Sequence, residues 1–120
     1  MLQIAALLLT SASVSQVDFA CQPSESTKND LRTATKMVQR LPELATWTKD
    51  KSVFDTGKRT RINGKCYEAI YVYSIMESKD LHLSYVFAVN ISTNNILFVD
   101  IGKLEAMTLK EWRLRLAHGH

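Results

Sequence analysis

Residues 65–91 read KCYEAIYVYSIMESKDLHLSYVFAVNI, and this stretch has the clearest strand pattern in the chain. From Cys66 to Ile75, and again from Leu81 to Ile91, successive side chains alternate between two faces, which is typical of β-strands that bury one face. The polar residues Glu77 to Asp80 separate the two runs and predict a turn. Because a connection this short cannot cross over a sheet, the two strands must be antiparallel. The stretch therefore predicts a long β-hairpin.

Further strands are expected on both sides of this hairpin. Ser52 to Thr56 and Arg59 to Ile62 contain residues that favour strands, and a turn at Gly57 separates them. Asn63-Gly64 is a strong signal for a type I′ turn. After another polar turn, Ile96 to Ile101 forms one more run of strand formers. The sequence thus predicts an antiparallel meander of three to five strands.

A helix is expected before the strands. Apolar residues spaced three and four positions apart predict an amphipathic helix over residues 27–41, with Thr27 or Ser26 as its N-cap. Pro42 lacks a backbone donor, so we expect it to interrupt the helix. A short turn should follow, in which Trp47 caps the core.

These elements predict an α+β domain. One N-terminal amphipathic helix would pack on a curved antiparallel sheet of about four strands, followed by a short C-terminal helix that the capping box Thr108 to Glu111 opens. The chain has 120 residues, 46% apolar and 22% charged, which suits a single domain over residues 27–117. The face of the sheet away from the helix carries Tyr, Ile and Val. We expect that face to dock a partner or a second copy of the chain.

Residues 1–15 have the pattern of a secretory signal peptide, an apolar segment followed by small residues. Cleavage after Ala12, Ser13 or Ser15 would place small residues at positions −3 and −1. The alternative is a buried N-terminal helix, because the segment holds no Lys or Arg. Its dense apolar part, residues 2–9, is too short to span a bilayer, so we expect no stable membrane insertion. The mature chain is expected to be periplasmic or secreted, with residues 16–26 as a polar lead-in and residues 118–120 as a tail.

The two cysteines, Cys21 and Cys66, both lie in the expected mature chain. An even pair in an exported protein predicts a disulfide, which contributes about 4 kcal/mol to a small core in the chain-entropy model. Two unrelated buried thiols are the alternative for a cytosolic chain. A lipid anchor on Cys21 is disfavoured by Asp18 three residues before it. Without a Cys-x-x-Cys motif or a Cys/His cluster, we expect no metal site.

Residues 49–65 are the basic part of the chain, with six Lys and Arg against two Asp. Nucleic-acid binders pair such cations with stacking aromatic residues, and this stretch holds only Phe54, so we expect no nucleic acid. We instead predict contact with a protein partner that has an acidic surface. A solvated hairpin is the alternative. The expected partner-binding residues are Lys58, Arg59 and Arg61, with Tyr71 and Tyr73 as aromatic anchors.

No motif in the sequence identifies an enzyme. Glycine-rich nucleotide loops and the Gly-x-Ser-x-Gly elbow are missing, so we expect no cofactor. His82, Ser84 and Asp100 have the residue types of a hydrolytic triad, and Glu68 with Asp100 would make a carboxylate pair. Nothing in the pattern brings these side chains together, and we expect no catalytic residues.

From Thr27 to Ile101, one helix followed by an antiparallel meander resembles the cystatin-like or NTF2-like roll. Gln16 to Ala20 does not satisfy the cystatin motif Gln-x-Val-x-Gly, so inhibition of papain-like proteases is not implied. Residues 41–47, 64–67 and 109–113 are similar to small exported bacterial proteins. This resemblance implies a non-enzymatic exported binding protein, such as an inhibitor or immunity protein of an envelope-acting enzyme. The alternative is a small NTF2-like enzyme or ligand-binding carrier with a pocket on the sheet.

Overall fold

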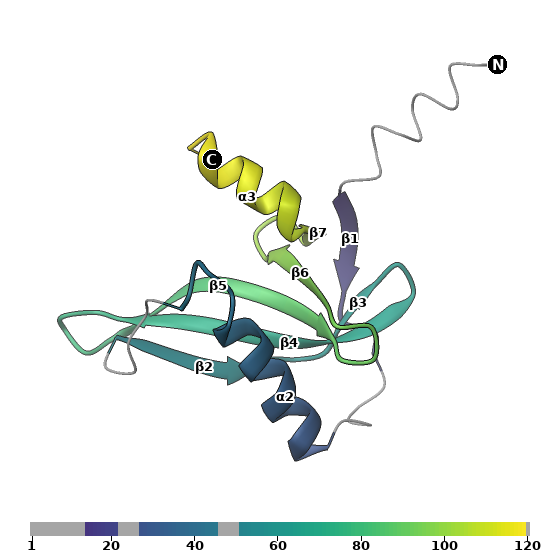
Figure 1. Ribbon diagram of the computed structural model, residues 1–120, viewed down its shortest axis with the longest axis horizontal. Coiled ribbons are helices and arrows are strands. Elements are labelled where there is room, and N and C mark those ends of the chain that lie inside the picture. The colour runs from purple at the N-terminus through teal and green to yellow at the C-terminus, as the bar shows by residue number, and fades with distance from the viewer. Residues whose placement is uncertain (1–13, 22–26, 46–50, 120) are drawn as a thin grey trace.

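The protein consists mainly of β-strands joined by tight turns (Figure 1). The computed structural model describes residues 14–21, 27–45 and 51–119. Within these residues the elements are β1 (Val14–Asp18), α2 (Lys28–Gln39), β2 (Ser52–Thr56), β3 (Thr60–Ile62), β4 (Lys65–Ile75), β5 (Leu81–Asn90), β6 (Asn95–Asp100), β7 (Glu105–Thr108) and α3 (Leu109–Ala117).

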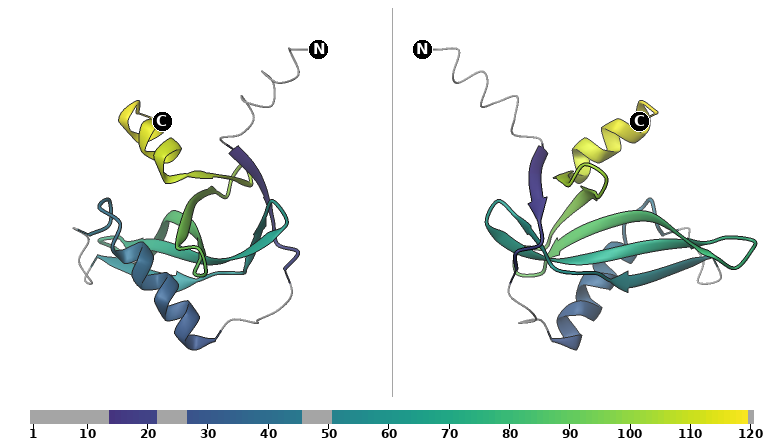
Figure 2. Two further views of the ribbon diagram at one scale, coloured as in Figure 1. Left: turned by 45° about the vertical axis from the view of Figure 1, so that its right-hand side comes forward. Right: turned by 180° about the vertical axis from the view of Figure 1, so that it is seen from behind.

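Six of the seven described strands close into an antiparallel barrel. Their order around the ring is β4-β3-β1-β7-β6-β5, and β5 pairs back with β4. β2 is the extra strand. It lies along the same edge of β4 as β3 does, but farther from the Asn63-Gly64 turn. Figure 2 shows β1, β6 and β7 rising from the flat β4–β5 ribbon to complete the ring.

The expected fold, an α+β domain with an N-terminal helix on a sheet of about four strands, is therefore wrong. β1 precedes the helix, and β7 lies between β6 and the C-terminal helix. β1 closes the ring, because it pairs with β3 on one side and with β7 on the other. The face of the sheet away from α2, which we expected to dock a partner, lines the inside of the barrel instead.

The barrel interior is filled with small and β-branched side chains. Ala69 lies opposite Ala88, and Val86 lies opposite Val99, which in turn lies opposite Ala106. All five are at most 3% exposed. A six-stranded barrel has a narrow interior that such side chains can fill. The inside of the ring is thus a packed core.

Both described helices cover the outer face of the barrel. Ala34 and Val38 of α2 belong to a buried cluster with the outward-facing Ile70 and Phe87. The ring of Trp112 on α3 packs edge-on against Phe87, with the ring centroids 5.3 Å apart. The molecule therefore has two cores, one inside the barrel and one between the barrel and the helices.

The helix signals in the sequence are confirmed. Thr27 is the N-cap of α2, and its side chain and backbone exchange hydrogen bonds with Asp30. Thr108 caps α3 by accepting a hydrogen bond from the backbone N–H of Glu111 at 3.1 Å. Such caps satisfy backbone donors that the first turn of a helix leaves open. Trp47, which we expected to cap the core, lies outside the described residues.

The turn and strand signals before the long hairpin are also confirmed. The strand predicted over residues 52–56 is β2, and the strand predicted over residues 59–62 is β3, which begins one residue later. Asn63 and Gly64 have φ angles of 53° and 77°, the positive values that a type I′ turn requires.

The alternation expected along residues 81–91 breaks at a β-bulge. Tyr85 lies opposite Val72 and Leu83 lies opposite Tyr73, so Ser84 is an extra residue in β5. Since opposed residues share a face, the bulge turns Leu83 away from the face that carries Tyr85. Leu83 therefore lies on the Tyr73 side of the sheet, past the end of the barrel.

Candidate functional site

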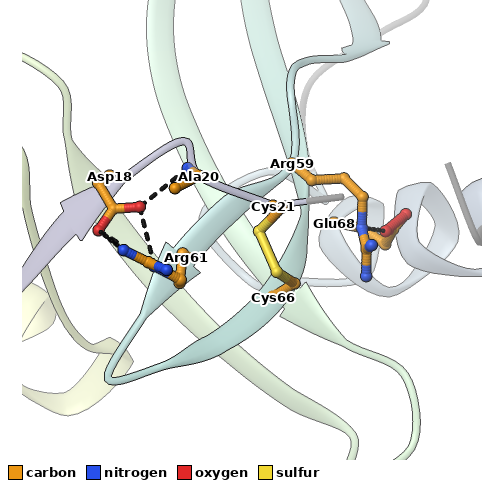
Figure 3. The surroundings of a disulfide bond; sticks show 7 residues. All are labelled: Asp18, Ala20, Cys21, Arg59, Arg61, Cys66 and Glu68. Carbon is orange, nitrogen blue, oxygen red and sulfur yellow. Dashed lines mark hydrogen bonds and ion pairs between the residues drawn. A yellow bond between two sulfur atoms is a disulfide. The ribbon is translucent and has the colours of Figure 1, made fainter. Parts of the chain in front are cut away.

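The end of the barrel at the β3–β4 turn is held by a disulfide. Residues 19–21, which follow β1, pass beside β3 and β4 (Figure 3). Cys21 and Cys66 are bonded there, with their Cα atoms 5.9 Å apart and a sequence separation of 45. The predicted disulfide is confirmed. It ties the segment after β1 to the long hairpin. We call this region, residues 18–21 and 58–68, the stapled end.

An exposed ion pair lies beside the disulfide. The guanidinium of Arg61 contacts the carboxylate of Asp18, with Nε 3.0 Å from Oδ1. The backbone N–H of Ala20 donates to the same carboxylate at 2.9 Å. These two hydrogen-bond donors, the Ala20 N–H first and Arg61 second, lower the pKa of Asp18. The pair joins the end of β1 to β3, because Asp18 and Arg61 lie opposite each other in the antiparallel pairing of these strands.

A second ion pair on the stapled end is largely buried. Arg59 donates from Nε to Oε1 of Glu68 at 2.8 Å. The Glu68 side chain is only 6% exposed and that of Arg59 is 23% exposed. Both residues line a polar cleft of about 260 Å³, together with Asp30 and Asn90. Because the cleft holds two carboxylates and one guanidinium, it suits polar groups rather than an apolar ligand.

The predicted contact residues do not form one site. Lys58 is exposed, and its Nζ lies 6.0 Å from the centroid of the Phe19 ring. It shares the stapled end with Arg59 and Arg61, both of which already have carboxylate partners. The basic excess that the sequence shows at this end is therefore partly neutralised by Glu68 and Asp18.

The two predicted aromatic anchors lie farther along β4. The ring of Tyr71 packs against Gly57 and against the core inside the barrel, and burial raises the pKa of its hydroxyl. Tyr73 lies one step nearer the far end, with its ring centroid 6.4 Å from that of Tyr71. Tyr71 is thus part of the barrel wall, whereas Tyr73 belongs to the end opposite the disulfide.

The candidate catalytic side chains are engaged elsewhere or lie apart. The Ser84 hydroxyl is 2.6 Å from that of Ser74, and Asp100 accepts a hydrogen bond from the backbone N–H of Lys103. Ser84 and Asp100 line the same groove between β5 and β6, whereas Glu68 lines the cleft on the stapled end. Residues 14–21, 27–45 and 51–119 contain no group of three or more His, Cys, Asp and Glu that is placed to hold a metal ion.

Sequence reasoning missed the apolar surface at the other end of the long hairpin. The alternation expected along residues 81–91 would place Leu81 and Leu83 on the same face as Phe87, yet they are 54% and 38% exposed. Met76 beside them is also exposed. No local signal marks the bulge at Ser84, so the alternation alone placed these leucines on the wrong face.

The chain matches no protein-family model, no curated protein and no solved structure. Nothing therefore identifies the cystatin-like or NTF2-like family. In the part of the chain that the structure describes, no helix has both the length and the apolar character needed to cross a bilayer.

Proposed function

We propose that this protein is an exported, non-enzymatic binding protein whose stapled end contacts an acidic surface on a protein partner. One observation carries the proposal: Lys58, Arg61 and Lys65 reach solvent just before β3, on β3 and at the start of β4, in a region that a disulfide and two ion pairs hold in place. A rigid surface loses little conformational entropy on binding. Inhibitors and immunity proteins of envelope-acting enzymes are the class we favour.

Export is supported by the disulfide and by the N-terminal pattern. Structural disulfides persist in oxidising compartments such as the periplasm or the extracellular space. β1 also discriminates among the three cleavage points. Cleavage after Ser15 would remove Val14 and Ser15, which pair with Met107 and Ala106 of β7. We therefore favour cleavage after Ala12 or Ser13, which leaves β1 whole.

Two lysines supply most of the charge with which the stapled end would attract a partner. Glu68 and Asp18 offset Arg59 and Arg61, so Lys58 and Lys65 supply most of the uncompensated charge. Exposed charges of this kind chiefly raise the association rate and fix the partner's orientation. We expect binding to weaken with rising salt, because exposed charges are screened within about 10 Å at 0.1 M salt.

The proposal is tested by charge reversal. Lys58→Glu with Lys65→Glu should abolish recovery of a specific partner from envelope extract, or slow its association at least tenfold. The matched control is Lys36→Glu with Lys110→Glu, which reverses two exposed lysines on α2 and α3. Equal binding by the two double variants, or no specific partner for the wild type, would overturn the proposal. Intact mass under non-reducing conditions shows the cleavage point and the disulfide.

A ligand-binding carrier is the second candidate, and the polar cleft beside Glu68 and Arg59 is the observation that favours it. The sheet itself offers no room for the pocket of such a carrier in the described barrel, because its concave face is packed core. A thermal-shift screen of small polar compounds tests this alternative. Stabilisation that Arg59→Met abolishes, while Arg61→Met leaves it intact, would favour the carrier over the protein-binding proposal.

A further inference from the structure

The far end of the β4–β5 hairpin projects past the barrel (Figures 1 and 2). We call residues 73–84 the projecting end. Its exposed apolar side chains are Met76, Leu81 and Leu83. Leu81 and Leu83 lie opposite Ile75 and Tyr73, so they share the face of the sheet that forms the barrel interior farther along. Past the ring, that face is exposed instead of enclosed.

The projecting end also has an unpaired strand edge. Residues 81–84 of β5 run beside β4, but β6 pairs with β5 only over residues 86–90. No strand among the described residues pairs the other edge of residues 81–84. Open edges of this kind can pair with another chain, and proteins normally protect them with charges, prolines or bulges.

The two open edges of the β2-β4-β5 ribbon differ in that protection. β2, on the opposite side, carries Asp55, whose carboxylate accepts a hydrogen bond from the backbone N–H of Thr56, and Lys51 precedes the strand. The edge at residues 81–84 carries no Asp, Glu, Lys, Arg or Pro. One edge is thus guarded by charge, whereas the other has only the bulge at Ser84 to protect it.

We propose that the edge at residues 81–84 pairs with the same edge of a second copy of this chain. An antiparallel pair of identical strands has a two-fold axis, and opposed residues share a face, so one residue must lie opposite itself. With Leu83 on the axis, His82 lies opposite Ser84 of the second copy. No like charges meet in this register, and the exposed leucines of both copies gather on one face.

A groove beside the edge accommodates the second copy. Where β6 leaves β5, residues 83–86 and residues 98–101 line a groove of about 280 Å³. The pairing brings the hairpin turn of one copy, residues 77–80, to the end of this groove in the other. That turn has a net charge of −1, and in the other copy it would face Lys103 and the exposed Leu104 as well as Asp100, which lines the groove.

The dimer would join two ribbons into one continuous sheet, β2-β4-β5 of one copy followed by β5-β4-β2 of the other. The stapled ends would then lie at opposite extremes of the assembly. A dimer would present two copies of the basic surface and gain affinity for a multivalent partner. Only this gain in affinity rests on the proposed function. The dimer itself does not depend on that function.

The first test is the molar mass of the mature protein in solution, measured by light scattering over a range of concentrations. The wild type should approach twice the mass of one chain. Leu83→Lys places a charge on the axis and should give a monomer at every concentration. The matched control is Leu114→Lys on α3, which changes a leucine that is 48% exposed and should leave the dimer intact. A monomeric wild type, or equal behaviour of the two variants, would overturn the proposal.

A second variant tests the register of the β5–β5 pairing between the two copies. It does so by a gain of cross-linking rather than by loss of the dimer. Because Leu83 lies opposite itself, Leu83→Cys should form a disulfide between two copies on mild oxidation, seen as a doubled mass on a non-reducing gel. Leu114→Cys should cross-link at least tenfold more slowly at the same concentration. A wild-type dimer in which Leu83→Cys fails to cross-link would show that another surface assembles the chains.

Discussion

The two ends of the β4–β5 hairpin differ in how far their interactions are satisfied within one chain. At the stapled end, a disulfide and two ion pairs join β1, β3 and β4. At the projecting end, the ribbon has left the barrel, and leucines are exposed along an open edge. The first end has its interactions satisfied within one chain, whereas the second leaves apolar surface and backbone groups for another molecule. Specific changes at each end can test this difference.

The largest effect is expected from the disulfide. Cys21→Ser with Cys66→Ser should lower the free energy of unfolding by about 4 kcal/mol, because a closed loop of this length restricts the unfolded chain. Urea denaturation of the variant and of the wild type measures the difference. Reduction of the wild type is the control and should give a similar loss. A change of well under 1 kcal/mol would mean that the ion pairs alone hold the stapled end.

The two arginines on the stapled end should differ in their contribution to stability. Arg59→Met leaves the buried Glu68 carboxylate without its guanidinium and should cost about 2 kcal/mol. Arg61→Met is the matched control, and it should change stability little because the pair with Asp18 is exposed to solvent. Equal losses in urea denaturation would contradict this contrast between a buried and an exposed pair.

The stapled end should also respond to acid. The pKa of Asp18 is lowered in the folded protein, so its contribution to stability is complete above its unfolded pKa of about 4 and is lost as pH falls through the lower, folded pKa. Asp18→Asn should therefore lower stability at pH 7 and have a smaller effect near pH 2. Thermal unfolding of both proteins between pH 2 and pH 7 measures this difference in stability. If the stability of Asp18→Asn changes with pH in parallel with that of the wild type, the Asp18 carboxylate makes no such contribution.

The smallest effect on the stability of a single chain is expected at the projecting end. Leu83→Ser removes a side chain that reaches solvent, so unfolding of the dilute monomer should change by about 0.5 kcal/mol or less. Phe87→Ala, four positions along the same strand and fully buried, should cost about 3–5 kcal/mol. Comparable losses for the two variants would show that the projecting end is packed against the rest of the chain.

Much of the local structure and part of the stapled end follow from the sequence. The period of two in β4, the Asn63-Gly64 turn and the Thr27 cap depend on neighbours within a few residues, so the sequence is enough to predict them. The disulfide was predictable because the chain holds only two cysteines. The carboxylates that pair with the arginines of the stapled end were not predictable in this way. Asp18 meets Arg61 across 43 positions, and only the ring brings them together.

Backbone geometry over short distances sets where the strands of the long hairpin turn and which residues alternate along β4, so both features follow from the sequence alone. The tertiary structure decided whether the second face of the sheet became a surface or a core. β1 pairs with both β3 and β7, and that non-local pairing closes the ring and buries the face. The tertiary structure also placed the bulge at Ser84, because the register of β5 against β4 is a property of the pair rather than of either strand.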